Sequence, residues 1–133
     1  MIKLIVVGKT KEQFIKLGIN EYLKRLQRFT KLEYIEVNHF NNLKLDNQFL
    51  IVLDIKGINY SSEELALFLN KNINNNLTFI IGDEDGIQEE LKKKASLLLS
   101  LSRMTFTHEF ARLIFLEQLY RAITINKGMK YHK

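Results

Sequence analysis

Three short and almost purely aliphatic runs constrain the fold of this chain more than any other feature. They are Ile2–Val7, Phe49–Ile55 and Leu77–Ile81, which end at Gly8, at Lys56-Gly57 and at Gly82. Runs of this length without polar alternation indicate strands that are covered on both faces. The chain must therefore supply helices for two sides of a sheet.

Segments with helical spacing separate these strands. Lys11–Phe29 carries its apolar residues at steps of four and three, and Ser61 and Glu64 have the spacing of a capping box at the start of another helix. The alternating segment Leu32–Phe40 indicates one more strand. Strand–helix alternation predicts an α/β fold, a mostly parallel sheet flanked by helices, in a single domain over residues 1–133.

Composition excludes several classes of protein. The 133 residues include no cysteine, which rules out a disulfide framework and a thiolate metal site. No apolar run approaches the roughly 20 residues of a membrane helix, and the first seven residues resemble a strand more than a signal peptide. His39, His108 and His132 lack metal-ligand spacing. We expect a cytoplasmic protein with no metal and no membrane contact.

The net charge of +5 favours a polyanionic partner, but many lysine-rich proteins have no such partner. The basic residues around the first helix, such as Lys24, Arg25 and Arg28, are interpreted as a solvated face in preference to an RNA contact. Charge alone therefore does not decide the function.

The C-terminal half carries the candidate site. After Leu77–Ile81, Gly82–Gly86 combines two glycines with three carboxylates and predicts a turn. Ile87–Leu98 is predicted to be a helix, Leu99–Phe106 a strand or extended loop, and His108–Asn126 a helix with Glu117 four residues before Arg121. Ligands of parallel sheets bind beyond the carboxyl ends of the strands, which here are 53–57, 82–86 and 99–106.

Taken on these residues alone, an Asp-Gly turn followed by core leucines is the favoured interpretation of this half. Neither G-x-G-x-x-G nor G-x-x-x-x-G-K-[ST] is present, so a dinucleotide or P-loop site lacks its phosphate cradle.

Several motifs in one order change that interpretation. They are Ile80-Ile81-Gly82 with Gly86, Leu99-Ser100 through Met104-Thr105-Phe106 to His108, Arg112, Glu117 through Ala122, and the final Tyr131-His132-Lys133. Together they closely resemble the RlmH family of SPOUT methyltransferases, over essentially the whole chain. The resemblance implies an S-adenosylmethionine-dependent enzyme that methylates N3 of a pseudouridine in 23S ribosomal RNA. It also implies a C-terminal trefoil knot and a homodimer whose interface includes the last helix.

The resemblance places the cofactor on residues at three strand ends, namely Leu53, Gly82, Leu99, Ser100, Leu101, Ser102, Arg103 and Met104. This chain departs from the family at Asp83, where a second glycine is usual, and at Thr107, where proline is usual. The linker Asn41–Gln48 is also short where other members often carry an extra helical segment. Asp83 is the departure that bears on cofactor affinity.

The reaction also requires groups that hold the base and favour loss of its proton, because an imide nitrogen is largely protonated at neutral pH. The predicted catalytic residues are Arg112, chosen by charge, and the family's terminal pair Tyr131 and His132. His132 would handle the proton or orient the base, and Tyr131 would stack or anchor the tail. The predicted RNA contacts are Arg121, Lys130 and Lys133. On sequence alone, a frayed tail is the favoured interpretation of the last three residues.

A second hypothesis is a non-catalytic, basic module that binds the ribosome or its RNA and has lost the cofactor; Asp83 is its only support in the sequence. For the enzyme we expect assembled ribosomes to be the substrate, since so small a domain has little surface for reading RNA sequence.

Overall fold

The chain alternates strands and helices in the predicted order. The computed structural model describes residues 1–41, 43, 45 and 49–133. The elements are β1 (Ile2–Val7), α1 (Gln13–Leu26), β2 (Leu32–Val37), β3 (Phe49–Asn59), α2 (Ser62–Lys71), β4 (Leu77–Ile81), α3 (Glu89–Lys94), β5 (Leu97–Ser100) and α4 (His108–Asn126). Residues 42, 44 and 46–48 of the linker lie outside the described residues, and so does most of the prediction made for that linker.

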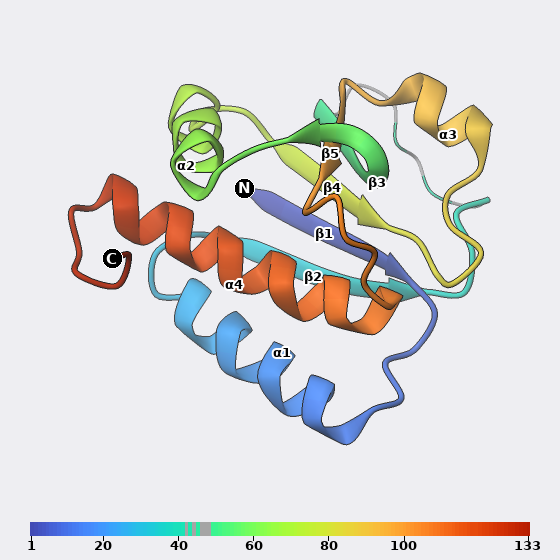
Figure 1. Cartoon of the computed structure of the whole chain (residues 1–133), viewed down its shortest axis with the longest axis horizontal. Coiled ribbons are helices and arrows are strands. Elements are labelled where there is room, and N and C mark those ends of the chain that lie inside the picture. The colour runs from blue at the N-terminus through green and yellow to red at the C-terminus, as the bar shows by residue number, and fades with distance from the viewer. Residues whose placement is uncertain (42, 44, 46–48) are drawn as a thin grey trace.

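The strands form one parallel sheet in the order β2-β1-β4-β3-β5 (Figure 1). β1 and β4 lie inside this sheet, paired on both edges, and Ile2 pairs with Leu77 at the start of their ladder. The parallel α/β fold predicted from the aliphatic runs is confirmed.

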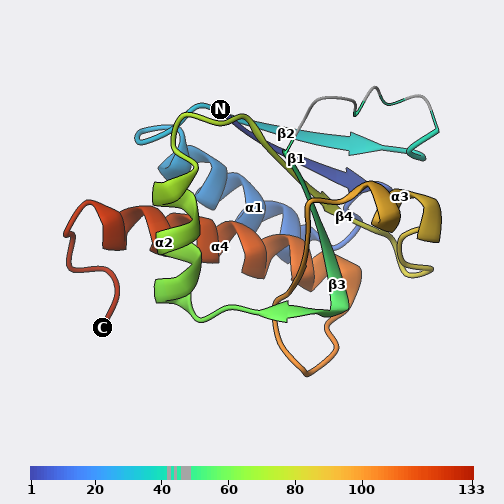
Figure 2. The ribbon, with the colours of Figure 1, turned by 90° about the horizontal axis from the view of Figure 1, so that it is seen from above.

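Helices cover both faces of the sheet. α1, α2 and α4 lie on one face, and α3 lies on the other (Figure 2). Neighbouring strand residues serve opposite faces, so Leu4 and Phe79 belong to the larger core while Ile5 and Ile80 belong to the smaller one beside α3. Burial on both faces explains why these strands have no polar alternation.

α4 is the longest helix and lies between α1 and α2 (Figure 1). Its fully buried side chains are Arg112, Phe115, Leu116, Leu119, Ala122 and Thr124. Neighbours on several sides bury more than one stripe of this helix, and Ala111, Ile123 and Ile125 are partly buried against the same core. No helix in the described part of the chain has the length and apolar composition needed to cross a membrane.

The segment before α4 corrects the prediction most clearly. Residues 87–98 were predicted to be helical, but α3 ends at Lys94, and Leu97 and Leu98 already pair with β3. The strand predicted for 99–106 therefore begins earlier and ends at Ser100, and residues 101–107 form a loop. A run of leucines fits a helix and a buried strand equally well, so pairing with β3 decides the outcome.

β3 also runs past its predicted end at Ile55, because its pairing with β5 shifts register between Leu53 and Ile58. Gly57 lies in this shift, where an added Cβ would come within 2.6 Å of the Leu98 backbone. Only glycine lets the two strands approach so closely there.

Candidate functional site

A cavity of about 610 Å³ lies at the carboxyl ends of β4 and β5, beside the register shift in β3. Its walls come from residues 53–55 of β3, the loop after β4, residue Lys92 of α3, the segment 99–107, and His108 and Ala111 of α4. This is where an open parallel sheet is expected to bind ligands, and the volume suits one small molecule.

The structure brings the predicted binding residues together here. Leu53, Gly82, Leu99 to Ser102 and Met104 line the cavity, whereas Arg103 does not. The cavity wall also includes Lys92, Thr107, His108 and Ala111, which lie outside the ranges predicted to bind a ligand. Asp54, Thr105 and Phe106 lie within the predicted ranges 53–57 and 99–106, although they were not among the predicted cofactor residues. No sequence signal pointed to Lys92.

At Gly82, in the cavity wall, the chain lies very close to the backbone of its own loop. A Cβ at this position would meet the Gly86 carbonyl oxygen at 2.7 Å and the Ile87 Cδ1 at 2.9 Å. The loop folds back because the Asp83 carbonyl accepts a hydrogen bond from Gly86 N at 2.9 Å, and Gly86 adopts a φ of 82°. Glycines at both ends therefore let this loop fold tightly against its own backbone in the cavity wall.

The two serines of the segment 99–106 shape the chain itself. Ser100 Oγ donates to the Ser102 carbonyl at 2.9 Å, and Ser102 Oγ accepts from Met104 N at 3.0 Å. These bonds turn the chain from β5 toward α4. The Leu-Ser alternation is therefore a strand end followed by a loop that is held by its own hydroxyls.

The polar part of the wall is mostly acidic. Asp54 and Lys92 form an ion pair at 3.2 Å, and the hydrogen bond from Lys92 to Asp54 raises the pKa of the Lys92 ammonium. Asp83 Oδ1 accepts from Asp85 N at 2.9 Å. The further carboxylates of the loop 83–85 have no counter-charge in the wall besides Lys92. This balance favours a ligand that carries positive charge.

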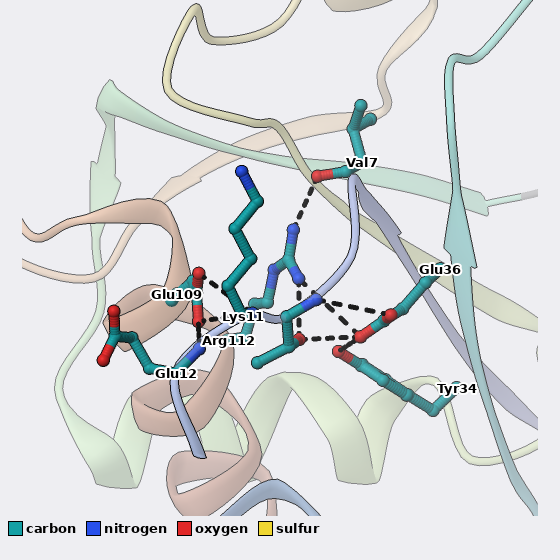
Figure 3. Close-up of polar contacts among 8 residues, drawn as sticks. Val7, Lys11, Glu12, Tyr34, Glu36, Glu109 and Arg112 are labelled. Carbon is teal, nitrogen blue, oxygen red and sulfur yellow. Dashed lines mark hydrogen bonds and ion pairs between the residues drawn. The ribbon is translucent and has the colours of Figure 1, made fainter. Parts of the chain in front are cut away.

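Arg112 lies outside the cavity wall and is fully buried at the other side of α4 (Figure 3). Its guanidinium donates to Thr10 Oγ1 at 2.8 Å and to the Val7 carbonyl at 2.5 Å. Glu36 lies 3.7 Å away and accepts from Thr10 Oγ1 at 2.7 Å. The catalytic role predicted for Arg112 does not fit this placement, because the guanidinium is enclosed by β1, β2 and the loop after β1.

The same network holds Tyr34, whose hydroxyl donates to Glu36 Oε2 at 3.1 Å. Burial raises the pKa of Tyr34 to about 12, so the hydroxyl keeps its proton and remains a donor. The Arg112 Nε is buried without a partner among the described residues. The network therefore ties the first turn of α4 to the carboxyl ends of β1 and β2.

Glu109 makes a second tie between α4 and the start of α1. Its carboxylate accepts hydrogen bonds from the backbone N–H groups of Lys11 and Glu12 at 3.0 to 3.2 Å (Figure 3). α1 has no side-chain cap of its own, so Glu109 supplies that cap from another helix. Burial alone would raise the pKa of Glu109, but the N–H groups of Glu12 and Lys11 outweigh it and lower that pKa.

The C-terminal tail packs onto the far end of α4. Tyr131 donates to Glu117 at 2.8 Å and stacks edge-on against Tyr120, with ring centroids 4.7 Å apart. Burial, followed by the hydrogen bonds to Tyr22 and Glu117, raises the pKa of Tyr131. The tail is therefore held in this structure, in contrast to the frayed end favoured on sequence alone.

His132 is fixed by two charged side chains. Its Nδ1 lies 3.0 Å from Arg121 and its Nε2 lies 2.6 Å from Glu63 Oε1. A guanidinium can only donate and a carboxylate accepts, so these contacts fit a neutral ring with its proton on Nε2. Arg121 also forms the predicted pair with Glu117, at 2.9 Å.

The tail and the cavity lie at opposite ends of α4. The cavity wall includes His108 and Ala111 in the first turn, whereas the tail contacts Glu117, Tyr120 and Arg121 and follows the last turn. A 19-residue helix spans roughly 28 Å. Within one chain, therefore, the predicted catalytic tail does not meet the predicted cofactor residues.

Low pH should weaken the hydrogen bonds that the Glu109 carboxylate accepts from Lys11 and Glu12. Its folded-state pKa is lowered, so its contribution to the free energy of unfolding is present above the usual glutamate pKa and is lost as pH falls through the folded-state value. Glu109→Gln should cost about 1–2 kcal/mol at pH 7, the scale of a lost cap. The difference from the parent should shrink toward pH 3.

Urea unfolding followed by circular dichroism at several pH values measures this effect. The control is Glu90→Gln, which changes an exposed glutamate of α3 and should leave stability nearly unchanged throughout. A gap between parent and Glu109→Gln that stays constant with pH would contradict the proposed origin of the pKa shift.

Comparisons with known proteins agree with the motifs. The family model described as "Predicted SPOUT methyltransferase" matches residues 1–132. A ribosomal RNA large subunit methyltransferase H from Caldicellulosiruptor bescii is 42% identical over 154 aligned residues, which cover 100% of both chains. The protein of the same name from Streptococcus mutans is 39% identical and covers 99% of both chains. The first alignment is longer than this chain, so that relative carries residues that the chain lacks.

The fold also matches a solved structure, a probable methylase family protein from Haemophilus influenzae Rd KW20. The TM-score is 0.67 at 12% identity, and the match covers 99% of this chain and 70% of that one. This likeness concerns the fold alone, whereas the sequence matches extend over the whole chain at about 40% identity. The chain belongs to the SPOUT methyltransferases, in the family of ribosomal RNA large subunit methyltransferase H.

Proposed function

We propose that this chain transfers a methyl group from S-adenosylmethionine to N3 of a pseudouridine in 23S ribosomal RNA, within assembled ribosomes. Membership of the family makes the chain an S-adenosylmethionine-dependent rRNA methyltransferase. The observation that supports this cofactor site most strongly is the cavity itself, which gathers the family's three cofactor segments at one edge of the sheet.

The cavity fits this cofactor in shape and charge. The compact loop 82–86 closes one side of the cavity, and Leu53, Leu99 and Leu101 supply aliphatic surface for the adenine of the cofactor. The cofactor carries a sulfonium and an ammonium, which suit an acidic wall. Asp83, which replaces a glycine of the family, adds to that wall. When bound, the cofactor supplies an electrophilic methyl group.

We propose that two copies of the chain complete each site, since one chain holds its tail far from its own cavity. An exposed apolar patch supports pairing. Phe14, Leu17 and Phe110 are 54%, 62% and 43% exposed, and the rings of Phe14 and Phe110 lie 5.7 Å apart. A two-fold pairing with antiparallel α4 helices would cover this patch and bring each tail toward the partner's cavity.

Mixing two inactive variants tests this arrangement. Gly82→Val should close the cavity, and deletion of residues 131–133 should remove the tail. Each alone should be inactive. After mild denaturation and refolding together, about a quarter of the parent activity should return, because about half of the dimers are mixed and each has one complete site.

Methylation of ribosomes with a radiolabelled cofactor measures the recovery, and size-exclusion chromatography with light scattering checks that both variants remain dimers. Recovery near zero with dimers intact would show that the cavity and the tail of one chain serve the same site.

In such a dimer the tail would hold the target base. Tyr131 is suited to stacking, Lys133 and Lys130 are exposed cations suited to phosphate, and the guanidinium of Arg121, which His132 helps to hold, offers donors for the base carbonyls. Arg112 would act at a distance, by fixing α4. The tail therefore contacts the RNA as predicted, and Arg112 positions α4 without touching the target base.

Deleting residues 131–133 should lower methylation at least about 100-fold, the scale of a lost catalytic group. Cofactor affinity, measured by calorimetry, should change little because no residue of the tail belongs to the cavity wall that is proposed to hold the cofactor. The single variants Tyr131→Phe and His132→Gln separate stacking from hydrogen bonding. Tyr131→Phe keeps the ring and loses the hydroxyl, whereas His132→Gln loses the imidazole. Full turnover by the truncated chain would mean that the tail only packs on α4 and takes no part in the reaction.

The substrate is tested by mass-spectrometric mapping of 23S rRNA from cells that lack this chain. One pseudouridine should lose its N3 methyl group, and the purified protein should restore it on whole ribosomes far better than on naked rRNA. Equal rates on both would exclude a requirement for the assembled particle. An unchanged rRNA mass profile would exclude the proposed function.

We also propose the trefoil knot that the family implies for the C-terminal segment, on the support of family membership. Joining the two ends covalently in the native state tests it. After denaturation, a knotted circle should migrate differently from a circle that was closed from the unfolded chain.

A further inference from the structure

We infer that His108 is the residue that takes the N3 proton of the target base, an inference that rests on the proposed function. His108 is the first residue of α4, directly after the cap Thr107, whose hydroxyl accepts from Phe110 N at 3.3 Å. It lines the cofactor cavity and is partly buried. It therefore stands where the methyl group is delivered.

The ring of His108 is free to act, in contrast to that of His132. Among the residues that the structure describes, no hydrogen bond or ion pair is made by either ring nitrogen of His108, which lies at the start of α4 in the cavity wall. Both nitrogens of His132 are occupied, one by Arg121 and the other by Glu63. A neutral imidazole needs one unshared electron pair to accept a proton, and His108 has one available.

The other ionisable groups near the cavity are less suited to this task. Asp54 is paired with Lys92, and Asp83 is bonded within its own loop. Glu109 points toward the start of α1, and its lowered pKa makes it a weak base. Carboxylates are in any case much weaker bases than an imidazole.

The chemical step balances with His108 as base. The N3–H bond of the pseudouridine breaks and the proton moves to the free ring nitrogen of His108. The electron pair left on N3 forms the new N–CH₃ bond. The C–S bond breaks, its electrons stay on sulfur, and the sulfonium becomes a neutral thioether. The imidazolium then returns the proton to water.

The charged groups around His108 are mostly acidic. Glu109 is the next residue of α4, and the rest of the cavity wall contributes the carboxylates Asp54, Asp83, Glu84 and Asp85 and the ammonium of Lys92.

The test compares His108→Gln with the parent and with His39→Gln, which changes an exposed histidine after β2. Ribosome methylation by His108→Gln should have a kcat at least about 100-fold lower, with the calorimetric affinity for S-adenosylmethionine nearly unchanged. The parent rate should rise with pH as the general base loses its proton, and the variant should lose this rise. His39→Gln should match the parent.

A second readout does not depend on activity. In protein labelled with ¹⁵N-histidine, addition of S-adenosylhomocysteine should shift the ring resonances of His108 and leave those of His39 in place. A parent that binds the cofactor but methylates no RNA would defeat the proposed function, while these shifts would still place His108 at the cofactor.

Three results would overturn the inference. They are a loss of kcat smaller than about tenfold, a pH rise that persists in His108→Gln, and loss of cofactor affinity equal to the loss of rate. The last would mean that His108 only shapes the cavity.

Discussion

The buried guanidinium of Arg112 is the contact on which the arrangement of this site depends. It is fully enclosed and bonds to Val7 and Thr10, with Glu36 as counter-charge (Figure 3). Removing one partner of a buried charge is far more costly than losing an exposed pair, so the first turn of α4 has one favourable position against the sheet. That turn also carries a wall of the cofactor cavity. A residue expected to act on the substrate instead decides where the helix begins.

The start of α4, held in this position, and the edge of the sheet together form the candidate site. The loops after β4 and β5 meet residues 53–55 of β3 at one edge because the strands are parallel, and Gly82 lets the loop after β4 fold tightly there. α4 then runs away from this edge to the tail, where Tyr131 and His132 are bound. One straight helix therefore separates the two halves of the predicted catalytic machinery, and a two-fold pairing is the simplest way to reunite them.

Much of this could be predicted from sequence. Aliphatic runs gave the buried strands, the Ser61–Glu64 capping box is present in α2, and His108–Asn126 is helical as predicted. The boundary between α3 and β5 was missed, because Leu97 and Leu98 suit a helix or a strand equally until β3 is beside them. The burial of Arg112 was missed because charge normally signals exposure. Only the three-dimensional structure shows that its partners lie about a hundred residues earlier, at Val7 and Thr10.

The central claim is that the tail of one copy serves the cavity of another. The chain has no natural cysteine, so Asp85→Cys and Lys133→Cys introduced together give an unambiguous cross-link between the cavity loop and the tail. Oxidation of the purified protein followed by peptide mass spectrometry should yield a covalent dimer in which residue 85 of one chain is joined to residue 133 of the other. A disulfide formed only within single chains, or none in protein shown to be dimeric, would contradict this account.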